Sequence, residues 1–312
     1  MPDFTVVICT HDRVQLLGKT IESLNAASRP QSVVVDILVA ANACTDGTVE
    51  WLERYACGGD DDNRLPLHWI EEPRAGKSYA LNSVLEHVDS ALLAFVDDDH
   101  RVDRNYLTEI VDSTRRFPAA TMFCGRILPD WDGSEPAWVH DQGPYRIYPP
   151  PVPWFELGPE PCAVTPGKSI PGGGNLFMYN GVLERTGGFR TDLGPKERGL
   201  GGSEDTDFVL RALHQGEVMR YEPSVVQYHY VDPARLTLRY VLAKSYQRSK
   251  SVTMVRSKPS GRMPMYLWRK AFVYLASAML SLNWARTRFY MVRFMATVGE
   301  MRGLSKACGP GR

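Results

Sequence analysis

The sequence has little of what marks exported or cysteine-stapled proteins. Its 312 residues include only six cysteines, which are far apart and form no Cys-x-x-Cys pair, so neither a zinc ribbon nor a disulfide scaffold is indicated. The N-terminus lacks the succession of basic, apolar and small residues that makes a signal peptide. We therefore expect a globular protein that stays in the reducing cytoplasm.

Acidic residues are scarce in the last quarter of the chain. The net charge is zero, but residues 235–312 hold 16 Lys and Arg against one acid, Glu300, which gives +15 and leaves −15 for the first 234 residues. The uncharged run between Lys270 and Arg286 is shorter than the roughly 20 residues of a spanning helix. We expect a basic helical C-terminal extension that lies on an anionic membrane surface, at the inner face of the cytoplasmic membrane. The alternative is a helical subdomain packed on the core. Nucleic acid is not expected, because the basic residues are interleaved with apolar runs.

Strand-like and helix-like segments alternate over the first 127 residues. Short β-branched runs are separated by segments with apolar residues at helical spacing. This rhythm indicates an α/β fold with a Rossmann-like, mostly parallel central sheet, helices on both faces and ligands at the carboxyl ends of the strands. We expect strands over 4–10, 33–42, 65–72, 91–99 and 120–128, and helices over 14–27 and 77–88.

Proline marks a change after the fifth expected strand. Of the 22 prolines, 11 fall between Pro129 and Pro171, together with three tryptophans. A loop of this length with aromatic residues is typical of a wall or lid beside a ligand, and the alternative is a rigid surface excursion. Order returns afterwards with a glycine-rich turn, a helix expected to begin behind Ser203 and a strand that carries His229.

Three successive carboxylates end the fourth expected strand. Asp97, Asp98 and Asp99 follow five apolar residues, although like charges repel and a buried strand end is a costly place for them. A divalent cation such as Mg²⁺ or Mn²⁺ prefers oxygen ligands and would account for the cluster. The alternative is a solvated acidic turn that leads into the next helix.

A second acidic cluster begins a later helix. Glu204, Asp205 and Asp207 crowd its first turn behind a glycine-rich loop at 199–202. Acids in a first turn complement the helix dipole, which explains most such patterns. Three acids exceed what capping requires, and glycine lets a backbone lie close against a ligand. One of these carboxylates is therefore a candidate general base.

Two single residues are weaker candidates. Lys77 lies in a stretch that resembles the end of a P-loop, but Glu71 stands where that motif needs a glycine. Lys77 can still contact a phosphate from the start of its helix. His229 is either a structural histidine of its strand or an additional metal ligand.

Seven short motifs follow one another in a fixed order: "VVICTHDR", "NACTDGT", "EEPRAGKSYALN", "FVDDDH", "GGGNLFMYN", "GGFRTDLG" and "GGSEDTDF". Together they resemble the family 2 inverting glycosyltransferases, which have the GT-A fold. The resemblance covers about Phe4 to Tyr230. It implies a GT-A catalytic domain over 1–234, with a nucleotide-sugar-binding half at 1–127 and an acceptor-side half at 128–234, and 235–312 as the helical extension.

The resemblance also implies roles for individual residues. In this family an Asp-x-Asp type motif holds a metal ion against the diphosphate of a nucleotide sugar, and Asp99 matches that ligand while His229 matches a further one. Asp205 matches the base that takes a proton from the acceptor hydroxyl. The implied nucleotide-sugar contacts are Thr10, Asp12, Arg13, Asn42, Asp46, Lys77, Asp97 and Asp98. The implied acceptor side consists of Gly173, Gly174, Asn175 and Glu204.

The expected protein is thus an inverting glycosyltransferase with Mn²⁺ or Mg²⁺ as cofactor. It would move a sugar from a nucleotide-diphosphate sugar to a saccharide or lipid-linked acceptor, in polysaccharide biosynthesis for the cell envelope. Departures from the family at His11, Asp12 and Ala41 leave the donor nucleotide open. The alternatives are a nucleotidyltransferase of similar fold, whose glycine-rich start is missing, and a catalytically silent sugar-binding member of a polysaccharide assembly. Both carboxylate clusters argue against the silent form.

Overall fold

The chain divides into two compact units. The computed structural model describes residues 3–58, 63–148, 151–167, 169–192, 204–256 and 263–307. Unit 1 comprises Met1–Asp130 and Trp154–Tyr230, and unit 2 comprises Trp131–Pro153 and Val231–Arg312. The proline-rich segment is therefore shared by the two units. The glycine-rich loop at 199–202 and the expected cap Ser203 lie outside the described residues.

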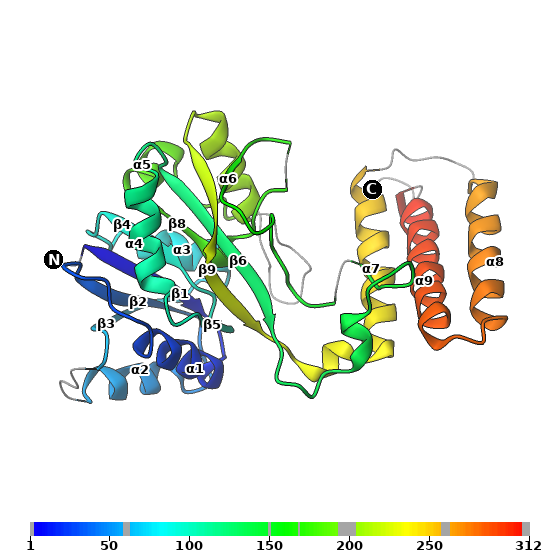
Figure 1. Ribbon diagram of the computed structural model, residues 1–312, viewed down its shortest axis with the longest axis horizontal. Helices are drawn as coiled ribbons and strands as arrows, with labels where there is room; N and C mark the ends of the chain where they lie inside the picture. The colour runs from blue at the N-terminus through cyan, green and yellow to red at the C-terminus, as the bar shows by residue number, and fades with distance from the viewer. Residues whose placement is uncertain are drawn as a thin grey trace. The chain divides into compact units, whose positions relative to one another are not determined.

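The described part of unit 1 is built on a nine-stranded sheet (Figure 1). Its strands are β1 (Phe4–Thr10), β2 (Val35–Asn42), β3 (Leu67–Glu72), β4 (Leu92–Phe95), β5 (His100–Val102), β6 (Met122–Asp130), β7 (Cys162–Val164), β8 (Leu176–Tyr179) and β9 (Met219–Tyr230). Their order is β3-β2-β1-β4-β8-β6-β9-β5, and β7 also pairs with β9. The first four strands are parallel, as are β6 and β9. The remaining pairs are antiparallel.

Helices cover both faces of this sheet. They are α1 (Val14–Asn25), α2 (Thr48–Ala56), α3 (Lys77–Leu85), α4 (Tyr106–Arg116), α5 (Gly181–Thr186), α6 (Glu204–His214) and the 3-10 turn η2 (Gly173–Asn175). Because side chains alternate along a strand, Val6 and Ile8 of β1 pack with α1, α2 and α4, whereas Val7 packs with α3, α5 and α6. The predicted α/β class, a mostly parallel sheet between two helical layers, is confirmed.

The three aspartates form a turn and do not extend the strand expected over 91–99. β4 ends at Phe95. The backbone N–H of His100 then donates to the carbonyl of Asp97 at 3.0 Å, which closes a tight turn into β5. The carboxylates of Asp97, Asp98 and Asp99 therefore leave the backbone in different directions, as the lack of alternation in a turn allows.

The described part of unit 2 is mainly helical. It contains α7 (Leu238–Arg256), α8 (Met265–Met279) and α9 (Trp284–Ala307), with the 3-10 turns η1 (Ala137–His140) and η3 (Pro233–Leu236). α9 packs against both α7 and α8 (Figure 1). Among the described residues, no helix combines the length and the apolar character needed to span a bilayer.

Two glycines let α9 approach the α7 backbone closely. A Cβ added to Gly299 would lie 2.2 Å from the carbonyl oxygen of Tyr246, and one added to Gly303 would lie 2.7 Å from that of Lys250. Both distances are far below van der Waals contact. The spacing of four residues places the two glycines on one side of α9, so this seam requires them.

Gly299→Ala is therefore expected to lower the free energy of unfolding of the helical unit by about 1–3 kcal/mol, because the added methyl group would push α9 away from α7. The matched control is Gly18→Ala in α1, where the new Cβ would lie 3.6 Å from the Trp51 ring in ordinary contact. Alanine there should be neutral or favour the helix by up to about 1 kcal/mol. Denaturant unfolding followed by circular dichroism measures both. Equal effects of the two substitutions would contradict a tight seam.

Candidate active site

The candidate site is a cleft of about 670 Å³ at the carboxyl ends of the central parallel strands. The strand register brings these ends together, since Thr10 pairs with Ala41 and Asn42 pairs with Glu72. Its lining is Cys9, Thr10, His11, Arg13, Asn42, Ala75, Gly76, Lys77, Ala80, Asp97, Asp98, Asp99 and His229. The size suits a small-molecule ligand, and charged side chains from four separate segments meet here.

Asp98 is held by its own chain. Its Oδ2 accepts a hydrogen bond from the Thr10 hydroxyl at 2.8 Å, and its Oδ1 accepts one from Arg13 at 3.0 Å. Burial raises the pKa of this carboxyl, and the Arg13 guanidinium opposes the rise. Asp98 therefore anchors the turn to the loop that follows β1.

Lys77 connects the first aspartate to the second acidic cluster. Its Nζ donates to Asp97 Oδ1 at 2.8 Å and lies 3.8 Å from Asp205 Oδ2. Burial opposes the charge on Lys77, but Asp205 and Asp97 hold its pKa well above the ordinary value. Burial also opposes ionisation of Asp97, yet Lys77 keeps that pKa well below its usual range. At Asp205 burial prevails over Lys77, and its pKa is raised.

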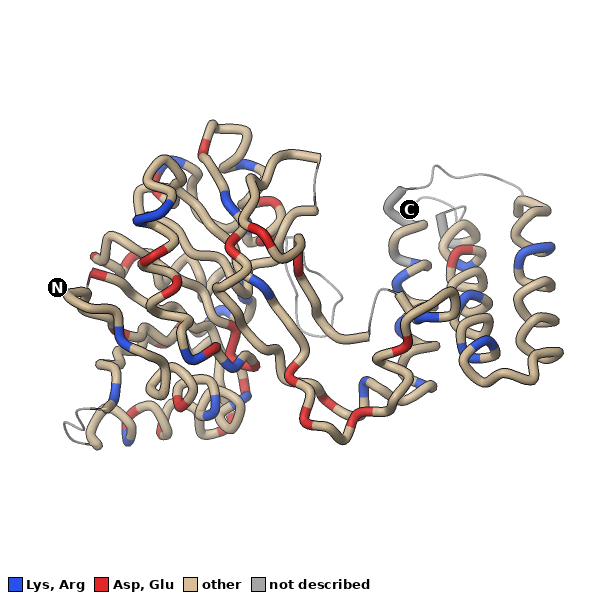
Figure 2. Tube along the Cα trace, viewed as in Figure 1, with Lys and Arg blue, Asp and Glu red and all other residues tan. Residues whose placement is uncertain are grey.

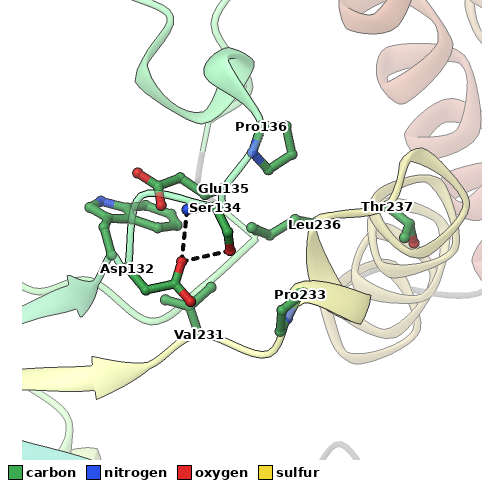
Figure 3. Close-up of a pocket in the computed structure, with 9 residues that line it drawn as sticks. Asp132, Ser134, Glu135, Pro136, Val231, Pro233, Leu236 and Thr237 are labelled. Atoms are coloured by element: carbon green, nitrogen blue, oxygen red, sulfur yellow. Dashed lines mark hydrogen bonds between the residues drawn. The ribbon is translucent and has the colours of Figure 1, made fainter.

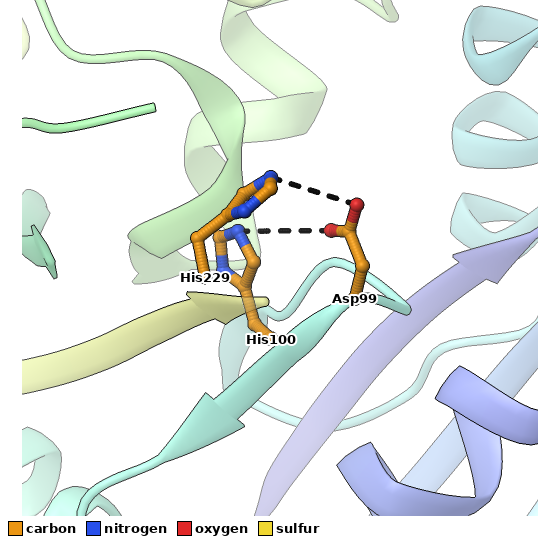
Figure 4. Close-up of side chains that lie close together, drawn as sticks. All are labelled: Asp99, His100 and His229. Carbon is orange, nitrogen blue, oxygen red and sulfur yellow. Dashed lines mark ion pairs between the residues drawn. The ribbon is translucent and has the colours of Figure 1, made fainter. Parts of the chain in front are cut away.

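Asp99 faces two histidines (Figure 4). Its Oδ2 lies 3.5 Å from His229 Nε2, and its Oδ1 lies 3.9 Å from His100 Nε2. His100 and His229 are direct partners in the antiparallel pairing of β5 with β9. Arg13 also donates to Asp99 Oδ2 at 3.0 Å. Ligand atoms of Asp99, His100 and His229 all lie within 4.8 Å of one another.

Hydrogen bonds behind the histidines fix their tautomers. Gln227 Nε2 donates to the Phe95 carbonyl at 3.0 Å, which turns Gln227 Oε1 toward His100 Nδ1 at 2.5 Å. An amide oxygen only accepts, so His100 Nδ1 carries a proton. His229 Nδ1 likewise lies 2.5 Å from the Tyr230 carbonyl and carries a proton. When the two rings are neutral, the Nε2 lone pair of each is directed toward Asp99.

This arrangement fits a divalent cation. Two lone pairs and a carboxylate converge, and in neutral rings no proton lies between them. Burial lowers the pKa of His229, and His100 adds to this effect against the opposing charge of Asp99, so the neutral ring is favoured. Imidazole nitrogen and carboxylate oxygen are both common ligands of divalent metal ions. The sequence alone did not indicate His100 or its support Gln227. Both signals were present, because His100 follows "DDD" and Gln227 shares a strand face with His229.

Two predicted nucleotide contacts, Asp12 and Asp46, lie on loops beside the cleft and do not line it. Asp12 has a left-handed backbone, with φ of 51°, and accepts from the Thr45 backbone at 2.5 Å. Asp46 accepts from the backbone N–H groups of Val14 and Thr48 at 3.0 and 3.2 Å, at the starts of α1 and α2. Both carboxylates thus hold the loops that carry Thr10 and Arg13.

Of the predicted acceptor-side residues, Gly173 and Glu204 lie next to Asp205, and Gly174 lies next to Asp97. A Cβ on Gly173 would lie 2.3 Å from Asp205 Oδ1, and one on Gly174 would lie 2.6 Å from Asp97 Oδ2, so only glycine fits against these carboxylates. Asn175 lies beneath, where its amide donates to the carbonyls of Arg126 and Val225 at 2.6 and 3.1 Å. Glu204 is buried in the first turn of α6.

A second hollow, of about 270 Å³, belongs to unit 2 and lies around Asp132, Leu236 and Thr237 (Figure 3). Its carboxylates are engaged by their own loop. Asp132 Oδ1 accepts from the Ser134 backbone at 2.9 Å, and Glu135 Oε1 pairs with His140 at 2.9 Å. The hollow in unit 2 gathers no such set of converging charges, so we place the candidate active site in the cleft of unit 1.

Comparison with known proteins agrees with this geometry. Residues 5–166, half of the chain, match glycosyl transferase family 2. The chain belongs to this family. Glucosyl-dolichyl phosphate glucuronosyltransferase of Haloferax volcanii is 26% identical over 141 residues, which cover 44% of this chain and 42% of that protein. The succinoglycan biosynthesis protein ExoM of Rhizobium meliloti is 22% identical over 246 residues, 77% of this chain and 71% of that one. The chain thus spans about two fifths of the first relative and about seven tenths of the second.

Two solved structures share the fold of this chain. The mannosyltransferase PcManGT of Pyrobaculum calidifontis, in complex with GDP-Man and Mn²⁺, has a TM-score of 0.58 at 17% identity, over 98% of this chain and 87% of that one. Residues 1–349 of S. aureus TarS, in complex with UDP, have a TM-score of 0.57 at 15% identity, over 97% and 90%. At these identities the likeness shows the fold alone, and the predicted GT-A architecture is confirmed.

The buried hydrogen bonds predict one tautomer for both histidines. In metal-free protein at mildly alkaline pH, His100 and His229 should each carry the proton on Nδ1, as ¹⁵N chemical shifts of the imidazole rings would show. Gln227→Leu should release His100 into a mixture of tautomers and leave His229 unchanged, because His229 is fixed by a backbone carbonyl. It should also cost about 1–3 kcal/mol of stability, since His100 loses its buried acceptor. An Nε2-protonated ring in the parent protein would contradict the assignment.

Proposed function

We propose that the protein is an inverting glycosyltransferase that moves a sugar from a nucleotide-diphosphate sugar to a saccharide or lipid-linked acceptor. The observation that carries this proposal is the connection of two acidic clusters through Lys77. Asp97 and Asp99 line the cleft, whereas Asp205 lies 3.8 Å from Lys77 in a small adjoining pocket that Lys77, Asp97 and Gly173 also line. Family membership, shown by residues 5–166, supports the same chemistry.

The donor would lie over the strand ends, with its diphosphate near Asp99, Arg13 and Lys77. Arg13 and Lys77 are the cations that line the cleft, and each can turn from an aspartate to a phosphate oxygen. A Mn²⁺ or Mg²⁺ ion held by Asp99, His100 and His229 would neutralise the diphosphate and its leaving charge. Thr10 and Asn42 would complete the nucleotide side, with Asp97 and Asp98 nearer the sugar and ribose.

The acceptor would react beside Asp205. Its hydroxyl oxygen attacks the anomeric carbon, the bond from that carbon to the diphosphate oxygen breaks, and the diphosphate leaves with the electron pair. The hydroxyl proton passes to Asp205, whose raised pKa suits a base. A single displacement inverts the configuration. Cys9 is no competing nucleophile, because burial raises its pKa to about 12.

The proposals for the acceptor and for the cellular location rest on the residues near Asp205 and on the names of two relatives. Gly173, Gly174 and Glu204 would border the acceptor, with Asn175 shaping that side from beneath. ExoM is named for succinoglycan biosynthesis and the Haloferax protein for a dolichyl phosphate substrate, so we include both saccharide and lipid-linked acceptors. Work on a lipid-linked acceptor in cell-envelope polysaccharide synthesis would place the protein on the inner face of the cytoplasmic membrane.

Asp205→Asn is expected to reduce the rate by roughly 10²- to 10⁴-fold, because an amide cannot accept the proton. The wild-type rate should also fall toward acid pH as Asp205 becomes protonated. Because the pKa of Asp205 is raised, this fall should begin at a higher pH than for an ordinary carboxyl, and it should be absent in the variant. The rate is the hydrolysis or transfer measured with the best donor from a panel of UDP, GDP and dTDP sugars with Mn²⁺.

A neighbour serves as the control for this substitution. Asp207→Asn alters the same helical turn outside the proposed acceptor side, where Asp207 pairs with Arg211 at 2.8 Å. If Asp205 serves only the helix dipole, its substitution should cost at most about 1 kcal/mol of stability and leave turnover intact. Near-wild-type turnover of Asp205→Asn would refute its role as base. A wild-type protein that binds donor sugars but turns over none would favour the silent sugar-binding alternative.

Asp99→Ala is expected to abolish the Mn²⁺-dependent part of nucleotide binding, because the cation would lose its carboxylate ligand. Calorimetry with UDP, GDP and dTDP, each with and without Mn²⁺, measures this and identifies the nucleotide. Asp103→Ala is a control on the same acidic stretch, since Asp103 lies outside the cleft lining. Unchanged metal dependence in Asp99→Ala would show that the three aspartates are only an acidic turn.

A further inference from the structure

The outer face of α8 and the turn after it expose many large apolar side chains. Among the described residues, 16 large apolar residues are strongly exposed, and ten of them fall within 265–284. Phe272 is 73% exposed, Met279 is 77% and Leu282 is fully exposed. Five of the ten recur in α8 at spacings of three and four and so form one stripe along the helix, namely Met265, Trp268, Phe272, Leu275 and Met279, and Leu282 follows in the turn after it.

The opposite face of α8 is apolar as well. Leu267, Ala271 and Ala278 are buried on the side where α8 meets α9. Within unit 2, α8 stands at the rim of the helical group, beside α9 (Figure 1). A helix with apolar residues on two opposite sides normally packs both of them against something. The outer face of α8 is therefore a candidate contact surface.

The net charge of residues 235–312 indicates what kind of partner would cover the outer face of α8. Residues 235–312 hold 16 basic residues against Glu300 alone. Glu300 is itself engaged, because Lys270 donates to its Oε2 at 3.1 Å. Lys and Arg positions recur along α7, α8 and α9 (Figure 2). Such a surface is attracted to an anionic partner and repels a second copy of itself.

Two features favour a lipid surface over a dry protein interface. The exposed apolar residues, from Leu275 round to Tyr266, cover roughly half of the circumference of α8, which is wider than a coiled-coil seam. Arg269 is exposed within this face, with Met265 and Val273 one turn to either side. In a dry interface its charge would need a buried partner, whereas at a bilayer surface it reaches a lipid phosphate.

The geometry points to α8 as a membrane-docking helix that lies in the headgroup region of an anionic bilayer, with Phe272, Met279 and Leu282 inserted. Tryptophan and tyrosine at both ends of the stretch, Tyr266, Trp268 and Trp284, suit that depth. This inference rests on the membrane location proposed above but not on the catalytic chemistry, since every residue in it belongs to unit 2.

The test is co-sedimentation of the full chain with vesicles of phosphatidylcholine alone or mixed with phosphatidylglycerol. The parent protein should bind the anionic vesicles more tightly. The double substitution Phe272→Ser with Met279→Ser should lower the partition coefficient by at least about tenfold, because two inserted side chains are lost. Trp268→Ser should weaken binding, whereas the matched control Trp154→Ser, which is similarly exposed in unit 1 at 54% against 59%, should not.

Donor hydrolysis without vesicles is measured on the same variants and should stay at the parent level, which separates failure of docking from failure of the proposed catalysis. Equal binding to neutral and anionic vesicles would overturn the inference, as would parent-level binding by the double variant. Sedimentation velocity tests whether a second copy of the chain covers this face instead. A dimer of the parent that the double variant breaks, with no vesicle binding by either, would assign the face to a second copy and also overturn the inference.

Discussion

Three adjacent carboxylates at the end of a buried strand are the constraint on which the catalytic unit depends. Repulsion among them has to be offset where they stand, and the turn closed between Asp97 and His100 sends each to a different neighbour. Arg13, 85 residues away along the chain, bonds to Asp98, and Lys77 bonds to Asp97. Parallel strands end at one edge of the sheet, so the loops after β1 and β3 can deliver these cations only if the strands keep their order. The acidic turn and the sheet topology thus require each other.

The charges of the acidic residues are incompletely compensated at two places, and at both places a side chain is left able to react or to bind a ligand. Lys77 is shared between Asp97 and Asp205, and it keeps the pKa of Asp97 below its usual range, whereas at Asp205 burial outweighs Lys77 and the pKa is raised. One carboxylate is thereby a firm partner and the other a group able to take a proton. On the far side, the tautomers of His100 and His229 direct lone pairs toward Asp99, which only an added positive charge would satisfy. The ligand proposed above, a cation together with a diphosphate, would complete both halves.

Local sequence patterns predicted many of the helices and strands. Contacts that depend on pairing between distant segments could not be predicted in this way. β1 and α1 begin where the sequence places them, because β-branched runs and helical periodicity act over a few residues. The sequence places Gln227 on the strand face of His229 but does not reveal that it supports His100, since that contact depends on the register that sets β5 against β9. A strand of three residues has too little alternation to reveal that register. Similarly, no periodicity in 131–153 indicates that this segment belongs with the C-terminal helices.

The surroundings of the three aspartates also indicate which of them has the structural role in the Asp-x-Asp type motif. Asp98 engages both of its oxygens with Thr10 and Arg13 and is almost wholly buried, so it has little capacity left for a ligand. Asp97 and Asp99, on either side of it, line the cleft as Asp98 does, and they meet Lys77 and the two histidines. Asp98 therefore holds the turn in addition to its proposed place near the sugar and ribose, and the outer two carboxylates are the candidates for direct ligand contact. Substituting the middle residue would disturb the positions of both others, so a loss of activity on that change would not by itself show that Asp98 contacts the donor.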